Sequence, residues 1–239
     1  MSLSNKVILV SGANRGIGAA TVRELLKTGV AKVYVGARNV ASLPDFNDAR
    51  VVPLQLDVTS DASVNTAAKT ATDVDVLLNN SGTMGFGDII SASQETIDAD
   101  MQTNFYGTLR VIRAFAPQFV SRGSGTIANV VSVVGLAAVP LLAGYSASKA
   151  ALQSLTQALR GTLGKSGVTV IGIYPGPVDT DLAKPIPLEK VTPEFAAENI
   201  VRGLEQGEAY IFPDPMAQQV EHLWANDGRQ LEAAMQLGG

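Results

Sequence analysis

The 239-residue chain contains no cysteine and only one histidine, His222. Without cysteine it has no disulfide framework, no thiolate nucleophile and no cysteine-bound zinc. A single histidine excludes a histidine-rich metal site and argues against a histidine-based catalytic triad, so we expect no metal. Any acid–base chemistry of this chain must use other side chains.

The chain also has little charge and no long apolar run. Charged residues make up 17%, and the formal net charge is −4. The absence of a basic excess argues against nucleic acid as a partner. No run approaches the ~20 residues of a membrane span, and the first residues lack the order of a secretory signal, so we expect a cytoplasmic protein without a membrane partner. Hydrophobic residues make up 46%, enough for one large core, and we expect 1–239 to form a single domain.

Short apolar runs alternate along the chain with longer amphipathic segments. The runs of strand length lie at 6–11, 32–37, 51–56, 74–79, 126–132, 168–174 and 209–212. The segments with helical spacing lie at 16–27, after 59, at about 93–120, near 144–163, at 193–206 and beyond 213. Strands that are apolar throughout and alternate with helices predict an α/β Rossmann fold: a doubly wound, mostly parallel sheet of about seven strands with helices on both faces.

A glycine-rich turn connects the first expected strand to the first expected helix. Residues 11–18 read Ser-Gly-Ala-Asn-Arg-Gly-Ile-Gly. Glycine at 12, 16 and 18 removes Cβ atoms where the backbone turns sharply, so N–H groups and a helix N-terminus can approach a pyrophosphate. The pattern alone is weak, but its place between a strand and a helix favours a dinucleotide site over a turn without a ligand.

The end of the second expected strand indicates which dinucleotide binds. An acid normally stands there and bonds the ribose 2′-hydroxyl. Here Ala37 and then Arg38 occupy this position. A carboxylate would repel a 2′-phosphate, whereas Arg38, with Arg15 as a second cation, would pair with one. We therefore expect NADP(H) rather than NAD(H), with Asp57 beside the adenine.

Tyr145 and Lys149 lie four residues apart, on one face of an expected helix. A free tyrosine has a pKa near 10, which a neighbouring ammonium and an oxidised nicotinamide would lower. Such a pair would donate and accept a proton without histidine. The alternative is a surface pair that adds about a few tenths of a kcal/mol to the helix. Ser132 and the turn 79–82 favour the site, because both follow strands and would lie at the carboxyl edge of the sheet.

In their order and spacing, these motifs resemble those of the classical short-chain dehydrogenases/reductases, from about residue 6 to residue 212. The resemblance also includes Asn104 and Pro175-Gly176, and it departs from the family's usual Asn-Asn-Ala-Gly turn by Ser81. It implies that the catalytic residues are Asn104, Ser132, Tyr145 and Lys149. It implies a cofactor site made of Gly12, Asn14, Arg15, Gly16, Ile17, Gly18, Arg38, Asp57, Val58, Asn80, Ser81, Gly82, Tyr145, Lys149, Pro175, Gly176, Val178 and Thr180.

By this resemblance, Tyr145 would protonate a carbonyl oxygen or deprotonate an alcohol, and Lys149 would lower its pKa and hold the nicotinamide ribose. Ser132 would orient the substrate oxygen, and Asn104 would hold a water that links Lys149 to solvent. The chain is thus expected to interconvert an aldehyde or ketone and an alcohol by direct hydride transfer with NADP(H). The alternative is a silent NADP(H)-binding redox sensor of the same fold, against which the complete set of four residues argues.

The sequence says less about the substrate. The segments 84–86 and 136–142 are apolar and contain no arginine or lysine. Two interpretations stay open: they surround an apolar or weakly polar carbonyl, or they merely pack under the loops. The segment at about 178–192 matches the family's substrate lid.

Two further features depend on the resemblance. In the family, the helices that correspond to 93–120 and 144–163 pair across a dimer axis, which implies a homodimer or homotetramer. The segment at about 213–239 departs from the commonest family ending, and we assign it no function. It carries His222 and Trp224, for which packing or surface exposure is the favoured interpretation.

Overall fold

Seven strands form one sheet in the computed structural model of the chain, which describes residues 2–237. They are β1 (Val7–Ser11), β2 (Lys32–Ala37), β3 (Val51–Gln55), β4 (Val76–Asn79), β5 (Gly125–Val130), β6 (Val168–Ile173) and β7 (Tyr210–Ile211). The strand order is β3-β2-β1-β4-β5-β6-β7, and each neighbouring pair is parallel. The predicted Rossmann architecture is therefore confirmed, with the order reversing between β1 and β4.

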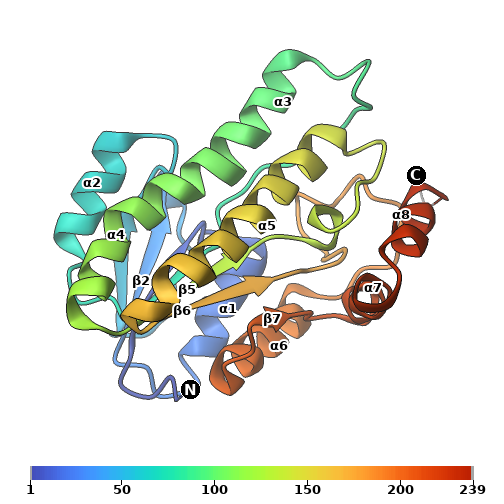
Figure 1. The fold of residues 1–239 in the computed structure, drawn as a ribbon. Coiled ribbons are helices and arrows are strands. Elements are labelled where there is room, and N and C mark those ends of the chain that lie inside the picture. The colour runs from blue at the N-terminus through green and yellow to red at the C-terminus, as the bar shows by residue number, and fades with distance from the viewer. Residues whose placement is uncertain (1, 238–239) are drawn as a thin grey trace.

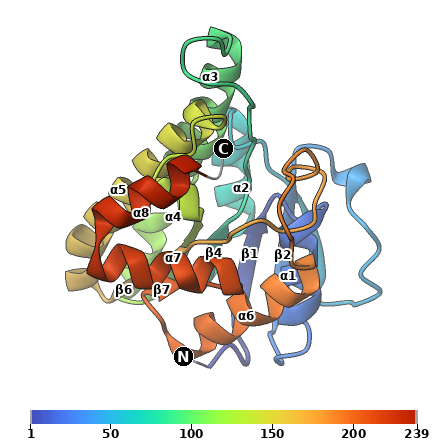
Figure 2. The same ribbon diagram turned by 90° about the vertical axis from the view of Figure 1, so that its right-hand side faces the viewer.

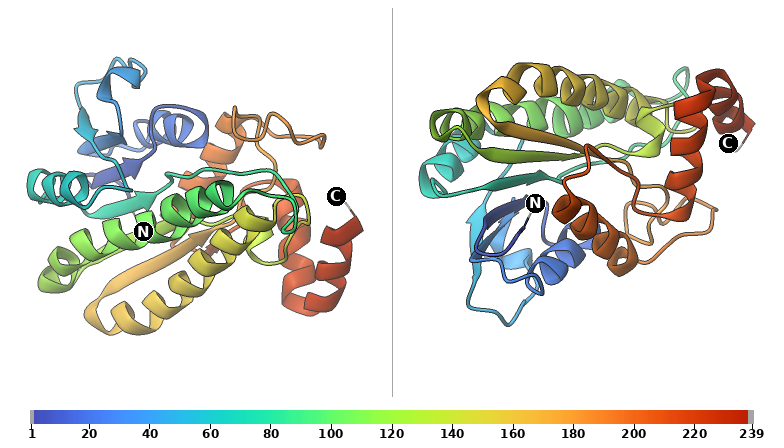
Figure 3. Two further views of the ribbon diagram at one scale, coloured as in Figure 1. Left: turned by 90° about the horizontal axis from the view of Figure 1, so that it is seen from above. Right: turned by 60° about the horizontal axis from the view of Figure 1, so that its bottom comes forward.

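Helices cover both faces of the sheet (Figures 1 and 3). They are α1 (Gly16–Leu25), α2 (Asp61–Thr70), α3 (Gln94–Asp100), α4 (Thr108–Arg122), α5 (Ala143–Leu163), α6 (Pro193–Gln206), α7 (Pro215–Asn226) and α8 (Gly228–Leu237). In Figure 3, α1 and α6 lie on one face, and α2, α4 and α5 lie on the other. Within residues 2–237, none of the helices combines the length and apolarity needed to cross a bilayer.

The alternation of side chains along each strand explains why the central strands are mostly apolar. In β1, Ile8 and Val10 pack with Val22 of α1, whereas Leu9 points to the other face and packs with Phe115 of α4. Successive side chains of a strand point to opposite faces, so a strand covered on both faces is mostly apolar, and a buried polar side chain in it needs a partner. Asn79 of β4 and Asn129 of β5 provide such a pair, with Nδ2 of Asn79 donating to Oδ1 of Asn129 at 2.9 Å. The apolar cores on the two faces of the sheet together hold in place the strands whose ends form the site.

The segment predicted as helical at about 93–120 is helical without a break from Gln94 to Arg122, but it is not one regular α-helix. α3 ends at Asp100, a π-helical segment η2 (Met101–Gly107) follows, and α4 begins at Thr108. In η2 the Asn104 side chain is fully buried and bonds the backbone of Thr83, which lies in another segment. A π-helical segment keeps the helical direction of the chain, so the apolar spacing of the sequence does not reveal it.

The C-terminal segment forms two helices, α7 and α8, which lie beside each other in Figure 2. Leu231 and Met235 of α8 are buried in a third apolar cluster that also contains Tyr145. Trp224 of α7 packs against the ring of Tyr174, just after β6, and against those of Tyr210 and Phe212 at β7, with its centroid 5.5 Å from that of Tyr210. His222 is exposed. Packing and surface exposure thus account for Trp224 and His222, while α8 reaches the site.

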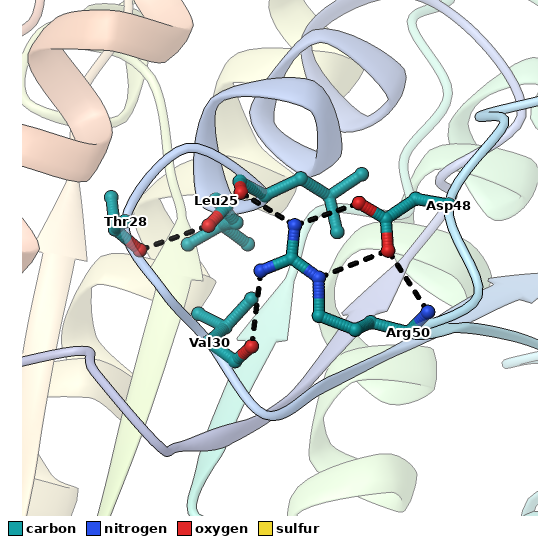
Figure 4. A network of polar contacts seen from close by, with 6 residues as sticks. Leu25, Thr28, Val30, Asp48 and Arg50 are labelled. Atoms are coloured by element: carbon teal, nitrogen blue, oxygen red, sulfur yellow. Dashed lines mark hydrogen bonds and ion pairs between the residues drawn. The ribbon is translucent and has the colours of Figure 1, made fainter.

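A polar network fixes the opposite end of the fold. The guanidinium of Arg50, just before β3, donates hydrogen bonds to the carbonyl oxygen of Val30 (3.2 Å) and to the carboxylate of Asp48 (2.7 and 2.9 Å), as Figure 4 shows. It also donates to the carbonyl oxygen of Leu26 at 2.7 Å. A cation near the last carbonyls of a helix is favourable, so Arg50 fastens the end of α1 to β3.

Candidate active site

A cavity of about 580 Å³ lies at the carboxyl edge of the sheet. Residues that follow β1 to β6 line it, and it lies across the point where the strand order reverses. In open α/β sheets ligands bind at such a switch point. All the predicted site residues except Gly18 and Asn104 line this cavity. They are Gly12, Asn14, Arg15, Gly16, Ile17, Arg38, Asp57, Val58, Asn80, Ser81, Gly82, Ser132, Tyr145, Lys149, Pro175, Gly176, Val178 and Thr180.

The glycine turn between β1 and α1 has a shape that other residues do not fit. Gly12 has φ +64° and Gly16 has φ +53°. A Cβ on Gly18 would lie 2.3 Å from the carbonyl oxygen of Gly12 and 2.5 Å from Nδ2 of Asn80. The first two glycines supply the left-handed backbone and the third allows close packing. The sharp turn that the sequence predicted at these positions is present, and its approach to a pyrophosphate stays a prediction.

The end of β4 holds this turn in place. Nδ2 of Asn80 donates hydrogen bonds to the carbonyl oxygens of Ser11 (3.1 Å) and Gly12 (3.0 Å). The backbone N–H groups of Asn80 and Ser81 both donate to Oγ of Ser11 at 3.0 Å. Sequence reasoning missed Ser11, although a hydroxyl at the last position of an apolar strand is a signal that could have identified it.

The N-terminus of α1 lies at the cavity, because Gly16 and Ile17 of its first turn line it. Arg15 precedes the helix in an extended conformation, and no side chain within residues 2–237 caps it. The first turn contains no acidic residue. Such an end carries partial positive charge and free donors, which is the environment that a pyrophosphate prefers.

Arg15 has a partner that the sequence did not suggest. Its Nη1 lies 3.0 Å from Oδ2 of Asp181, and both side chains are largely exposed. Asp181 belongs to the segment 178–192, whose ends are held together by a bridge between Val178 and Val191. The ion pair therefore links the glycine turn to that segment across the cavity.

Arg38 lies where the sequence placed it, exposed at the end of β2 and lining the cavity. Asp57, after β3, accepts hydrogen bonds from the backbone N–H (2.9 Å) and Oγ1 (2.7 Å) of Thr59. Burial acts to raise the pKa of Asp57, but these bonds and the charges of Arg38 and Arg110 outweigh it, so the pKa lies below its usual value. An ionised Asp57 beside Arg38 is thus maintained at neutral pH.

Tyr145 and Lys149 are both buried on α5, with Nζ of Lys149 5.6 Å from the centroid of the Tyr145 ring. Nζ donates a 2.8 Å hydrogen bond to the carbonyl oxygen of Val130. Burial lowers the pKa of Lys149 to about 8, against the opposing charge of Asp100. Burial raises the pKa of the Tyr145 phenol, although hydrogen bonding with Ser132 acts in the opposite direction. In the protein alone, desolvation outweighs the favourable effect of Ser132 on the phenolate, and the lowering of this pKa by Lys149 and a bound nicotinamide stays a prediction.

Ser132 has an unusual backbone conformation directly after β5. Its φ is +152°, in a region that non-glycine residues rarely adopt and that carries strain. Its Oγ donates to the carbonyl oxygen of Pro175 (3.3 Å) and accepts from the N–H of Val134 (3.4 Å). The strained position brings the hydroxyl to the cavity beside Tyr145, as predicted.

Asn104 lies behind the cavity wall rather than in it. Its Oδ1 accepts from the N–H of Thr83 (2.9 Å), and its Nδ2 donates to the carbonyl oxygen of Thr83 (3.0 Å) and to Oγ of Ser148 (2.9 Å). Ser148 in turn donates to the carbonyl oxygen of Tyr145 at 2.7 Å. Asn104 therefore connects the segment after β4 to the first turns of α5.

Comparison with known proteins identifies the family to which this fold and site belong. The family described as short chain dehydrogenase matches residues 6–190. The chain is a short-chain dehydrogenase. As a member of that family it is an oxidoreductase, and the resemblance of its motifs is confirmed.

Individual relatives of this short-chain dehydrogenase are similar to it over most of its length. A short-chain dehydrogenase from Burkholderia cenocepacia, solved in complex with NADP, is 36% identical with a TM-score of 0.92, covering 98% of this chain and 99% of that one. One from Sphingobium yanoikuyae, in complex with NADPH, is 26% identical with a TM-score of 0.80, covering 94% and 95%. An uncharacterized oxidoreductase of Staphylococcus saprophyticus is 33% identical over 219 residues, 86% of this chain and 94% of its own.

The part of the dehydrogenase's cavity beside Tyr145 is mostly apolar. Five charged residues of the described chain line the cavity. Four of them lie around the glycine turn and the ends of β2 and β3: Arg15, Arg38, Asp57 and Asp181. The fifth, Lys149, lies beside Tyr145. Apolar side chains line the remainder: Met84, Phe86, Val134, Val139, Leu141, Leu142, Ile186, Leu188, Met216, Ala234 and Met235. The two loops that the sequence singled out contribute to this wall, and the segment 178–192 adds Ile186 and Leu188.

Sequence reasoning missed the contributions of the C-terminal segment. Met216 of α7 and Met235 of α8 line the cavity. Asp214 caps α7 by accepting from the N–H of Ala217 (2.9 Å), and it also accepts from the N–H of Gly176 (2.8 Å) in the predicted cofactor site. The pair Asp214-Pro215 is a typical helix-start signal that could have identified the cap.

Proposed function

We propose that this short-chain dehydrogenase interconverts an aldehyde or ketone and an alcohol with NADP(H), using Tyr145 as the general acid and base. The observation that carries the proposal is the convergence of Ser132, Tyr145 and Lys149 on the cavity that also contains the glycine turn. A phenol, a hydroxyl and a buried ammonium together provide a proton donor, an orienting group and a positive charge for one substrate oxygen.

The choice of NADP(H) rests on three groups of the chain. The uncapped N-terminus of α1 and the close-packed glycine turn suit a pyrophosphate, and Arg38 suits a 2′-phosphate. The NADP and NADPH complexes of the two similar dehydrogenases support the same choice. When bound, the cofactor supplies or accepts the hydride at its nicotinamide ring. Pro175, Gly176, Val178 and Thr180 would flank that ring.

The protein's own part in the proposed reaction is proton transfer at the substrate oxygen. In reduction, Tyr145 donates its phenolic proton to the carbonyl oxygen, and its raised pKa means that the phenol is protonated and ready to do so. In oxidation, the phenolate accepts the proton of the alcohol. Ser132 donates a hydrogen bond that orients the oxygen, and the Lys149 ammonium stabilises the phenolate. A water held near Asn104 would carry the proton onward from Lys149.

The proposed substrate is an apolar or weakly polar carbonyl compound. The side chains around the substrate end provide no cation for a carboxylate or phosphate other than Lys149 within the described residues. Burying an anion among Met84, Leu142 and Met235 without a partner would be costly. We propose that the segment 178–192 is a lid over this end. We also propose that the protein is a homodimer or homotetramer, and sedimentation equilibrium tests this oligomeric state.

The experiment is a panel of carbonyl compounds with NADPH and NADH, followed by the corresponding alcohols, on the wild type and on Tyr145→Phe. We expect turnover of apolar carbonyls with NADPH, and a loss of at least about 10²-fold in Tyr145→Phe with NADPH binding nearly unchanged. Tyr106→Phe, at an exposed tyrosine, is the matched control and should keep full activity.

Two outcomes would contradict the proposal. If Tyr145→Phe retained most of its activity, the assigned acid and base would be wrong. If NADPH bound but no carbonyl or alcohol were turned over, the chain would instead act as a binding protein that senses the nicotinamide redox state.

A further inference from the structure

Asp100, the last residue of α3, is a buried carboxylate beside the site that the proposed reaction does not use. Among residues 2–237, the charged side chains that are buried are Asp100 (1% exposed), Lys149 (4%) and Asp214 (1%). Asp214 caps α7, which leaves Asp100 and Lys149 as buried groups of opposite charge. Burying a charge is costly unless an opposite charge or hydrogen bonds compensate it, so this pairing needs an explanation.

The carboxylate of Asp100 is held by the segment that follows β4. Oγ1 of Thr83 donates to its Oδ1 at 2.9 Å, and the N–H of Gly85 lies 3.2 Å from Oδ1 and 3.1 Å from Oδ2. These donors favour the ionised form, against the burial that raises the pKa of Asp100. The residue is thus equipped to carry a negative charge inside the protein.

The same segment touches Asn104 and Lys149. The backbone of Thr83 pairs with the side chain of Asn104 through two hydrogen bonds. A Cβ on Gly82 would lie 3.1 Å from Oδ1 of Asn104 and 3.7 Å from Nζ of Lys149. Residues 82–85 therefore form one short stretch of chain that passes near the ammonium at one end and bonds the carboxylate at the other.

The helices that carry the two charges also pack closely. A Cβ on Gly144, next to Tyr145 in α5, would lie 3.2 Å from Cγ1 of Ile97 in α3. The titratable groups that act on Lys149 within the described chain are Asp100, from α3, and Tyr145, from its own helix. α3 thus brings the buried carboxylate of Asp100 to the helix that carries Lys149, close enough for the two charges to interact.

We propose that Asp100 is a positioning residue of this site: its buried carboxylate keeps Lys149 in the ammonium form and holds residues 82–85 against Asn104. The proposal rests on the function proposed above, because the charge of Lys149 matters through the Tyr145 phenolate. Burial disfavours the ammonium, and the negative charge of Asp100 opposes this effect together with the hydrogen bond to the carbonyl oxygen of Val130. A neutral Lys149 would no longer stabilise the phenolate.

The test measures the titration of Lys149 itself. Protein with isotope-labelled lysine side chains is titrated by NMR, and Lys149→Met identifies the Lys149 signal by its loss. In Asp100→Asn, which keeps an acceptor oxygen for Thr83 and Gly85, we expect the Lys149 midpoint to fall by about one pH unit or more. Asp98→Asn, at an exposed neighbour on the same helix, is the matched control and should leave the midpoint unchanged.

A Lys149 midpoint that stays at the wild-type value in folded Asp100→Asn would overturn the proposal. If Asp100→Asn does not fold, Thr83→Val takes its place, because it removes one donor to the Asp100 carboxylate. We expect it to lower the Lys149 midpoint by a smaller amount. An unchanged midpoint in Thr83→Val would also overturn the proposal. Asp100→Glu keeps the charge and should restore a midpoint closer to that of the wild type.

The activity of the same variants separates this inference from the proposed function. With an apolar carbonyl and NADPH, Asp100→Asn should shift the pH profile of kcat while the KM of the substrate changes little. If the Lys149 midpoint falls but no carbonyl is turned over even by the wild type, Asp100 acts on Lys149 and the proposed function fails. If the wild type is active and the midpoint does not move, the function stands and the role of Asp100 fails.

Discussion

Nζ of Lys149 donates its 2.8 Å hydrogen bond to the carbonyl oxygen of Val130, the last residue of β5. This bond anchors the ammonium to the sheet, but one carbonyl does not replace the water that a free lysine binds. The pKa of Lys149 therefore falls from 10.5 to about 8 in the folded protein. The unfolded chain, in which the pKa returns to its ordinary value, binds the proton more tightly.

This difference predicts how stability depends on pH. Between about pH 8 and about pH 10, the unfolded chain holds more protons at Lys149 than the folded protein does, so the free energy of unfolding should rise with pH, by roughly 2 kcal/mol. Above about pH 10, the raised pKa values of Tyr145 and Tyr174 reverse the trend, because the unfolded chain then loses protons first. Urea unfolding across this range measures the effect.

Lys149→Met should abolish the rise of the free energy of unfolding with pH. Lys165→Met, at an exposed lysine, is the control and should keep this rise. If Lys149→Met showed the same rise as the wild type, another group would be its cause.

The cofactor proposal predicts a selective loss in Arg38→Asp. A carboxylate at the end of β2 would repel a 2′-phosphate and remove a charge-assisted pair, so NADPH binding should weaken by about 10- to 100-fold. NADH lacks that phosphate and should bind as well as before or slightly better. Fluorescence titration of each cofactor provides the dissociation constants. Arg113→Asp, at an exposed arginine of α4 outside the cavity, is the control and should leave the binding of both cofactors unchanged. Equal losses of NADPH and NADH binding in Arg38→Asp would refute the 2′-phosphate argument.

The network around Arg50 predicts a stability effect far from the cavity. Arg50→Met removes the hydrogen bonds to Leu26, Val30 and Asp48, so the urea midpoint at neutral pH should fall while the kinetic constants stay unchanged. The hydrogen bonds from Arg50 lower the pKa of Asp48 from 3.8 to about 2. A depressed carboxyl pKa stabilises the fold above the unfolded value, and this contribution disappears as the pH falls toward about 2.

The difference in stability between Arg50→Met and the wild type should therefore shrink over the same acid range. Arg202→Met, at an exposed arginine of α6, should show no such trend. A difference that stays constant down to the lowest pH at which both proteins fold would mean that Asp48 contributes nothing to the effect.

Much of the fold was predictable because its signals are local. β1 and β2 are short apolar runs that end at a glycine turn and at Arg38, and their bounds were predicted within one residue. The Tyr145 and Lys149 pair needed only helical spacing to be placed on one face. In each of these cases the residues that determine the structure are neighbours in the sequence.

The features that could not be predicted depend on contacts between distant segments. Asn104 lies in a π-helical segment and bonds Thr83, 21 residues earlier in the chain. Asp98 and Asp100 look alike in the sequence, yet packing against residues 83–85 buries Asp100 and leaves Asp98 exposed. Met235 has the spacing of an amphipathic helix, but the spacing does not tell that it faces the cavity. No local pattern separates these alternatives.

The apolar wall predicts that a new cation would change the substrate preference. Met216 of α7 lines the cavity and is half-buried, so Met216→Lys places an ammonium at the substrate end without emptying the core. The specificity constant kcat/KM for an apolar ketone should fall about tenfold or more, since the cation is solvated poorly there, and that for a ketoacid should rise because its carboxylate gains a partner. Gln219→Lys, on the exposed side of the same helix, should change neither constant. If Met216→Lys left the ratio of the two constants at its wild-type value, Met216 would not contact the substrate, and the C-terminal helices would serve only to close the fold.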